Sequence, residues 1–363
     1  MDTFIDAVLI MIGILGLYTY YRSIVRVMLI NRRERDIVEY LARFLAVSIT
    51  HAFVGNGRTY ERVQRAQAWT LPLFIFFAVA TWFLIVQLSF TFILVGTRSE
   101  ATWPRAFSSS GSALSTLGFL TPPQLLGEYL AIYEAAIGLA VVVLLFTFVP
   151  SYQAAIQARE RKVGWIFART GQHPSCVSLV EAFQRSGRID DISFWEEWES
   201  WFRGLLETHS ISPILAYAPS IYRGTNWVGA AAAVLDTASL HLSSIDSRHS
   251  DAVRICRETG VTTLQLIAAD LHRHRLAEVR TSDRLDANLT ATFDRLYDQL
   301  ADMKLSLKPD KEQCGNMFVT LRMEYASNIR RIARATLMPF EEPWVMTHAH
   351  AGTQPESGLR PSQ

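Results

Sequence analysis

The chain has 363 residues, half of them hydrophobic, and its mean hydropathy is positive at +0.14. Lysine and arginine number 35 against 34 aspartates and glutamates, so the formal net charge is +1. This balance excludes the strong positive field of a nucleic-acid-binding protein, whereas the hydropathy predicts membrane-spanning segments.

Three apolar runs are long enough to cross a bilayer as helices. Residues 4–21 contain one charge, Asp6; residues 69–96 contain none; residues 129–150 contain one, Glu134. About 20 apolar residues cross the hydrocarbon core, so the second run should tilt or extend beyond it. We therefore predict an all-α fold with three transmembrane helices.

The positive residues predict how these spans are oriented. A cleavable signal peptide starts with basic residues, whereas residues 1–6 contain none, so we expect an uncleaved anchor. Residues 22–68 are rich in arginine, whereas only Arg98 and Arg105 separate the second and third runs. Basic loops remain in the cytoplasm, which predicts a plasma (inner) membrane protein with its N-terminus outside. Residues 1–68 are then an anchor followed by a basic cytoplasmic loop that contacts anionic membrane lipids.

Residues 151–346 are expected to form a helical cytoplasmic domain. Apolar residues recur at a spacing of three to four in Trp195, Trp198, Trp201 and Leu205. This pattern predicts an amphipathic helix whose tryptophans face a core rather than a ligand. Residues 227–242 are apolar but short and contain Asp236, so we predict a buried helix there rather than a fourth span.

Two further amphipathic patterns follow, separated by residues 308–310. Their apolar positions are Leu285, Leu289, Phe293, Leu296 and Leu300, then Met317, Leu321, Tyr325, Ile329 and Ile332. We predict an antiparallel helical hairpin that either closes on itself or packs on a neighbouring subunit. Residues 347–363 are rich in glycine, proline and serine and are expected to be disordered.

The sequence contains no set of residues that indicates enzymatic chemistry. No glycine-rich nucleotide-binding motif is present, and no cofactor is expected. His272 and His274, two residues apart, fall on opposite faces of a helix and predict no metal site. The three cysteines have no paired spacing and are expected to be buried thiols: Cys176, Cys256 and Cys314.

Residues 108–123, rich in serine, threonine and glycine, lie between the second and third apolar runs. Non-helical backbone at membrane depth is tolerated only where it lines water or is packed in protein. The segment is either a re-entrant loop whose carbonyls coordinate cations, or a plain extracellular connection. The flanking spans favour the re-entrant loop.

Within this segment, Thr116, Leu117, Gly118 and Phe119 follow a short amphipathic stretch and precede a proline-containing exit. This order resembles the pore region of the potassium-channel superfamily, whose filter reads Thr-Val-Gly-Tyr-Gly, and the similarity covers residues 69–150. It implies a pore module with a selectivity filter at residues 116–119. The resemblance also implies that four identical chains surround one pore and that monovalent cations pass through it. The residues that follow are similar to bacterial ion-channel-like membrane proteins.

Leu120 stands where the family has its second glycine, and it resists a left-handed backbone by about 1 kcal/mol. This departure indicates a degenerate filter, shorter or wider and less selective. Glu134 and Gly138 share one helical face, which either lines the pore and bends in gating or packs behind the filter. In the packing alternative Glu134 is protonated or hydrogen-bonded to the serines of the loop segment, and Gly138 allows close helix approach. Pro150 either shapes a gate at the cytoplasmic mouth or simply ends the helix.

Two functions remain open. The first is an oligomeric cation channel whose cytoplasmic helices assemble or regulate it. The second is a non-conducting membrane scaffold or sensor that retains the channel-like fold and binds a partner through those helices. The missing second glycine supports the second function.

Overall fold

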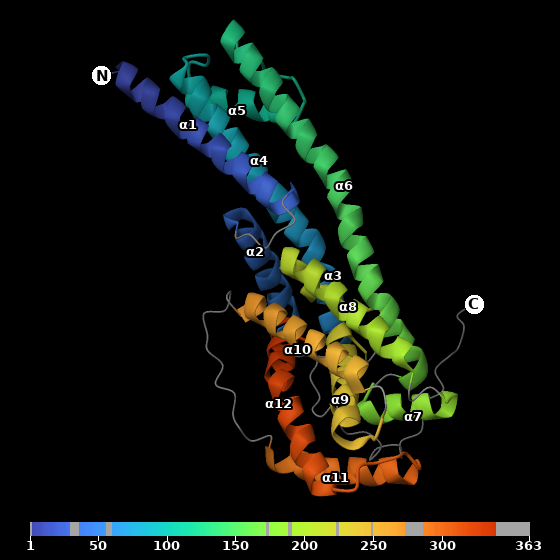
Figure 1. Cartoon of the computed structure of the whole chain (residues 1–363). Coiled ribbons are helices and arrows are strands. Elements are labelled where there is room, and N and C mark those ends of the chain that lie inside the picture. Colours follow the sequence, from blue (N-terminus) through green and yellow to red (C-terminus); the bar gives the residue numbers. More distant parts are fainter. Residues whose placement is uncertain are drawn as a thin grey trace, which may run out of the picture. The chain divides into compact units, whose positions relative to one another are not determined.

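The computed structural model describes residues 2–29, 36–55, 60–171, 174–187, 191–222, 225–247, 250–272 and 286–338. Within these ranges the elements are helices, with one isolated β-bridge between Ile245 and Leu307 (Figure 1). The expected all-α class is confirmed. Three sequence-based expectations fall outside the described residues. They concern the disordered tail at 347–363, Leu285 of the first amphipathic pattern, and His274, which was compared with His272.

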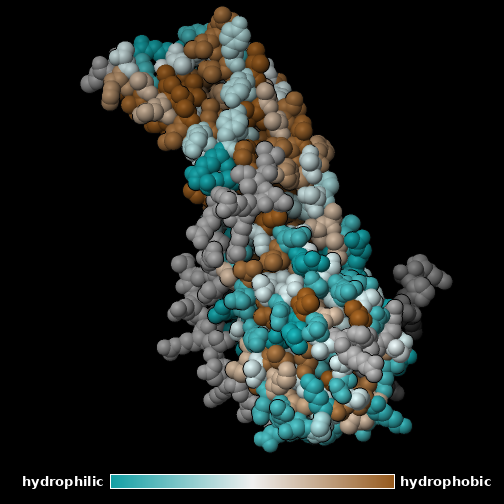
Figure 2. All heavy atoms as spheres, viewed as in Figure 1, coloured by the Kyte–Doolittle hydropathy of each residue, from teal (hydrophilic) through white to brown (hydrophobic). Residues whose placement is uncertain are grey.

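The chain divides into two compact units. The first comprises residues 1–57, 65–156 and 214–218, and the second comprises residues 58–64, 157–213 and 219–363. Hydrophobic residues dominate the visible surface of the first unit's helices, whereas hydrophilic residues are frequent on the second (Figure 2). Apolar helices therefore concentrate in one unit.

The helices of the N-terminal half are α1 (Asp2–Ile24), the π-helical turn η1 (Val25–Leu29), α2 (Ile37–Val54), α3 (Tyr60–Ala68), α4 (Thr70–Gly96), α5 (Trp103–Leu114) and α6 (Leu125–Thr170). Four helical segments of the described chain are long and apolar enough to cross a membrane, namely Thr3–Met28, Ile37–Val54, Glu61–Gly96 and Leu125–Thr170. A membrane-embedded protein is thus indicated.

Two features differ from the sequence-based expectation. The supposed basic loop contains α2, an apolar helix of 18 residues that was not expected. Pro150 does not end the third apolar helix, because α6, which has 46 residues, continues through Pro150 to Thr170. Proline removes one backbone hydrogen bond, and the turns on either side maintain the helix across that gap.

Glycines allow α1 to pack closely against α4. A Cβ at Gly16 would lie 2.1 Å from Oγ of Ser89, and one at Gly13 would lie 2.5 Å from Cγ1 of Ile93. Near the other end of this contact Arg98 forms an ion pair with Asp6 at 2.7 Å. Small residues at such positions let helix backbones approach in an apolar environment.

The second unit is built around α9 (Trp227–Ser244), every residue of which is buried. The expected buried helix is therefore confirmed. Around it lie α7 (Cys176–Ser186), α8 (Ile192–Ile211), α10 (Ser250–His272), α11 (Asp286–Asp302) and α12 (Lys311–Ala335); the short 3-10 helix η2 (Pro213–Tyr217) follows α8. α8 buries Trp195, Trp198 and Trp201, and α11 packs against α12. In Figure 1 these two helices cross steeply, whereas the expectation was an antiparallel hairpin.

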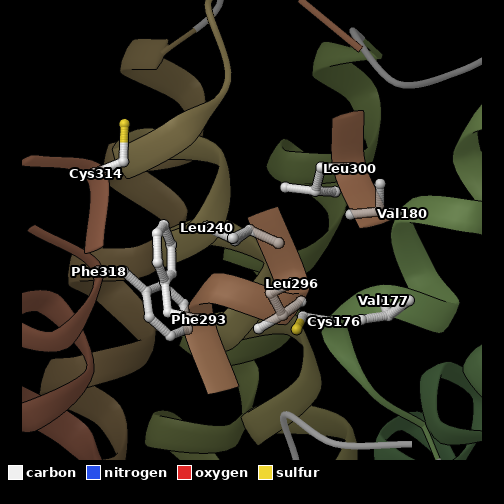
Figure 3. Packing of buried hydrophobic residues seen from close by; sticks show 9 residues of the cluster. All are labelled: Cys176, Val177, Val180, Leu240, Phe293, Leu296, Leu300, Cys314 and Phe318. Atoms are coloured by element: carbon white, nitrogen blue, oxygen red, sulfur yellow. The ribbon is translucent and has the colours of Figure 1, made fainter. Parts of the chain in front are cut away.

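One hydrophobic cluster joins α7, α9, α11 and α12. It consists of Cys176, Val177, Val180, Leu240, Phe293, Leu296, Leu300, Cys314 and Phe318 (Figure 3). Each large apolar side chain in such a core contributes about 1.5–3 kcal/mol. All three cysteines are free and buried, as expected.

Candidate functional site

α5 runs back along α4 after the chain has passed the end of that helix. The ring of Trp103, in the first turn of α5, packs edge-on against Phe92 with centroids 5.5 Å apart. Further along α5, the carbonyl of Phe107 accepts from Nε2 of Gln87 at 3.2 Å. Since Phe92 and then Gln87 lie progressively farther from the C-terminal end of α4, α5 descends beside it.

The contacts with α6 show the same descent. Oγ of Ser110 lies 2.5 Å from Oε1 of the buried Glu134. A Cβ at Gly138 would lie 2.1 Å from the carbonyl oxygen of Leu114, the last residue of α5. Because Gly138 has no side chain, the carbonyl end of α5 lies directly against the backbone of α6.

The chain then returns to the level at which it started. A Cβ at Gly127 would lie 2.4 Å from Cβ of Pro122 and 3.1 Å from Cβ of Ser99. Gly138 follows Gly127 by eleven residues, which is about 16 Å along a helix. Between Ser99 and Pro122 the backbone thus descends about 16 Å and climbs back.

The turn at the bottom is fixed by hydrogen bonds from the loop to α5. The amides of Leu117 and Gly118 donate to the carbonyl of Ser112 at 3.0 and 3.2 Å, and the amide of Leu120 donates to Oγ of Ser112 at 3.0 Å. The amides of Ser115 and Thr116 also donate to carbonyls of the last turn of α5. These amide donors are directed back towards the protein.

The carbonyl groups of the loop differ from its amides in their hydrogen bonding. Among the described residues, the carbonyl oxygens of residues 115–121 accept no hydrogen bond. The C-terminal end of α5, which carries a partial negative charge, is directed at the same turn. The loop therefore offers oxygen acceptors while the amides of residues 115–118 and of Leu120 are engaged, an arrangement suited to a cation.

Two loop residues have left-handed backbones, Thr116 with φ 58° and Gly118 with φ 67°. Leu120, at the position of the family's second glycine, does not adopt positive φ. A Cβ at Gly118 would meet no atom within 4 Å, so its special requirement is the dihedral angle. Leu117 and Phe119 are 71% and 69% exposed in the single chain.

The remaining candidate residues lie on α6. Glu134 and Gly138 face α5. Pro150 is exposed within the helix. Sequence reasoning gave the serines of the loop segment as candidate partners of Glu134 without singling out Ser110, and it missed Gln87. The amide of Gln87 within an uncharged apolar run was an available signal, because buried amides in such runs usually bond across helices.

The described residues contain no group of histidine, cysteine, aspartate and glutamate side chains that could hold a metal ion. The oxygen ligands that the loop offers are backbone carbonyls and the hydroxyls of serine and threonine. In comparisons with known proteins, no family model, no curated protein and no solved structure matches the chain.

Proposed function

We propose that the chain is one subunit of an oligomeric pore-loop channel for monovalent cations in the plasma membrane. In this proposal α4 and α6 cross the bilayer, and α5 with residues 115–121 enters from the outer side and returns. Four chains surround one pore, as the resemblance to the potassium-channel superfamily implies.

The observation that carries the proposal is the depth at which α5 ends. A descent of about 16 Å is roughly half of the 30 Å hydrocarbon core. Seven extended residues can cover about 23 Å, so residues 115–121 suffice for the return. Irregular backbone at that depth must line water or be packed in protein, and in one chain much of this segment is uncovered.

The chemistry of the loop supports a cation as the occupant. Carbonyl oxygens without hydrogen-bond donors can replace the hydration shell of an ion when several chains supply them. Leu120 does not turn left-handed, so the loop lacks the outer carbonyl ring that the second glycine of Thr-Val-Gly-Tyr-Gly supports. We therefore propose a short filter, less selective among monovalent cations.

The distribution of arginine supports a cytoplasmic second unit. With three crossings and the arginine-rich residues inside, the N-terminus is outside and the chain after Pro150 is inside. α6 continues from the loop module to Thr170, within the second unit. We propose that this unit regulates or assembles the channel.

The competing function is a non-conducting scaffold or sensor. The observation that favours it is Leu120, whose side chain and dihedral are incompatible with the family's outer carbonyl ring. In that case the cytoplasmic helices bind a partner and no ion passes.

Reconstitution of the purified full chain into liposomes, with K⁺ and Na⁺ flux and subunit count measured together, tests the proposal. We expect tetramers that conduct. A Gly118→Ala variant should remain tetrameric, since its backbone strain is only about 1 kcal/mol. Its flux should nevertheless fall at least about ten-fold. Gly187→Ala is the matched control, because Gly187 also has positive φ (68°) and open space around its Cβ position. Silent tetramers would favour the scaffold, and monomers or dimers would reject the pore.

A further inference from the structure

The hydroxyl group of Ser112 bonds to the loop rather than to the helix that carries it. Ser112 lies near the end of α5 and is fully buried. A serine hydroxyl in a helix commonly donates to the carbonyl four residues earlier, as those of Ser89 and Ser115 do at 2.6 Å. Oγ of Ser112 instead accepts from the amide of Leu120, eight residues later, at 3.0 Å. This side chain therefore bridges the turn that follows α5.

The carbonyl group of Ser112 has a more general role, because it closes the end of the helix. It accepts from the amides of Leu117 and Gly118 at 3.0 and 3.2 Å. Helices commonly end with such backward bonds around a left-handed residue, which here is Thr116 with φ 58°. Any residue at position 112 could supply that carbonyl. The bond to the amide of Leu120, in contrast, requires a side-chain acceptor.

Among the described residues, the bond to Ser112 is also the last one between the loop amides and α5. Past Gly118, within the part of the chain that the structure describes, the amides of Phe119 and Thr121 donate no hydrogen bond. Pro122 has no amide hydrogen to donate. The hydroxyl of Ser112 therefore anchors the part of the loop that the end of the helix does not reach.

The direction of each amide fixes the direction of the carbonyl group before it. In a trans peptide group the N–H and the C=O are antiparallel. The two bonds to the carbonyl of Ser112 thus turn the carbonyls of Thr116 and Leu117 away from α5. By the same rule, the bond from Leu120 to the hydroxyl of Ser112 turns the carbonyl of Phe119 away from α5. These three carbonyls accept no hydrogen bond from the described residues, so their oxygens are available to an ion.

We propose that Ser112 is a positioning residue of the ion pathway, whose hydroxyl directs the carbonyl oxygen of Phe119 towards the cation. Leu120 does not turn left-handed, so the carbonyl of Phe119 is the outermost one that the motif at residues 116–119 supplies. Without the hydroxyl, the peptide group between Phe119 and Leu120 is free to rotate and its oxygen leaves the ion. This inference rests on the proposed function, because it requires a cation in the loop.

Hydrogen exchange tests the bond itself, whether or not the protein conducts. Exchange in the full chain in detergent is resolved to single amides by mass spectrometry with electron-transfer fragmentation. Ser112→Ala removes the hydroxyl but leaves the backbone bonds, so the amide of Leu120 should exchange about ten-fold faster while that of Leu117 keeps its rate. The matched control is Ser109→Ala on the same helix. Ser109 is equally buried, but its Oγ has no hydrogen-bond partner among the described residues. Equal exchange of the Leu120 amide in both variants would refute the bond.

Ion flux tests whether the bond positions a carbonyl for a cation. The full chain is reconstituted into liposomes, and K⁺ flux is measured over a range of K⁺ concentrations. Loss of one oxygen ligand per chain weakens ion binding, so Ser112→Ala should raise the half-saturating K⁺ concentration at least about three-fold. Ser109→Ala should leave that concentration unchanged. A general loss of folded protein would lower the maximal flux and would not move the half-saturating concentration.

The two measurements separate this inference from the proposed function. If the unaltered protein conducts and Ser112→Ala keeps its half-saturating K⁺ concentration, the channel stands and the positioning role is refuted. If the unaltered protein carries no K⁺ flux, the channel fails. A Leu120 amide that still depends on Ser112 would then give this serine a structural role alone, which would also overturn the inference.

Discussion

Oγ of Ser110 lies 2.5 Å from Oε1 of Glu134 and 3.0 Å from the carbonyl oxygen of Gln87, so one hydroxyl links α5 to both α6 and α4. A serine hydroxyl carries one proton and can donate it fully to only one of these oxygens. A proton on Glu134 would satisfy both contacts, with Glu134 donating to Ser110 and Ser110 donating to Gln87.

Substitutions at Glu134 separate this hydrogen-bond role from a need for charge. Glu134→Gln keeps a donor for Ser110, and we expect thermal stability in detergent and cation flux to change little. Glu134→Ala leaves Ser110 without that partner, and we expect a loss of about 1–3 kcal/mol in the free energy of unfolding. If the glutamine variant were as damaged as the alanine variant, the carboxylate charge would be what matters.

Gly138→Ala should displace α5 from α6. The new Cβ would lie 2.1 Å from the carbonyl oxygen of Leu114, so backbone must move, and overpacking of this kind costs about 1–3 kcal/mol. We expect reduced stability and reduced flux together. The control is Gly204→Ala in α8, where no atom lies within 4 Å of the Cβ position and alanine should stabilise the helix by up to about 1 kcal/mol. A Gly138→Ala protein with full flux would contradict the close contact.

A buried ion pair in the second unit should tolerate double replacement better than single replacement. Nε of Arg322 lies 3.1 Å from Oδ1 of Asp236, whose side chain is 1% exposed, and the hydroxyl of Tyr325 donates to the same oxygen at 2.6 Å. Asp236→Ala leaves the guanidinium buried without its counter-ion, and we expect about 3–5 kcal/mol of destabilisation by chemical denaturation. Adding Arg322→Met should recover about half of that loss.

The matched control for this pair is an exposed one. Asp251 and Arg254 are 86% and 55% exposed at 3.0 Å, and Asp251→Ala should change the free energy of unfolding by less than about 0.5 kcal/mol. Strictly additive effects of the two substitutions at 236 and 322 would show that the pair is energetically uncoupled.

His209 should make the second unit sensitive to acid. Burial, and then the nearby charge of Arg159, lower the pKa of His209 to about 3. The unfolded histidine takes up a proton near pH 6.5 while the folded one remains neutral, so stability is full above pH 6.5 and falls as the pH drops towards 3. Between pH 7 and pH 5 we expect a loss of about 2 kcal/mol in denaturant titrations. His209→Gln should flatten this slope, and an unchanged slope would assign it to other groups.

Periodicity and composition were sufficient for much of the fold. The buried helix α9 and the amphipathic helices α11 and α12 follow from apolar spacing, which reflects the core that each helix must face. The membrane helices follow from length and hydropathy alone. These features are local, so the sequence around each of them contains the information.

The errors arose where a neighbouring feature overrode the local signal. The arginines around α2 indicated a loop, although residues 37–54 are themselves apolar. Pro150 indicated a helix end, but it lies within α6 because a single missing backbone bond does not outweigh the turns on both sides.

The loop site could be located from its motif, but its partners could not. The motif at residues 116–119 gives the turn, whereas the bond from Ser110 to Glu134 depends on how α5 packs against α6. Glu134 itself was found because an ionisable residue in an apolar run is costly without a partner. Which of several serines would be that partner required the structure.

The continuity of α6 has a mechanical consequence. A straight helix resists twisting, so a torque applied to the segment that ends at Thr170 reaches Glu134 and Gly138 unless something in between absorbs it. Pro150 is suited to do so, because its ring leaves the carbonyl of Phe146 without its usual donor. How much of a twist at Thr170 reaches Glu134 therefore depends on the stiffness of α6 around Pro150.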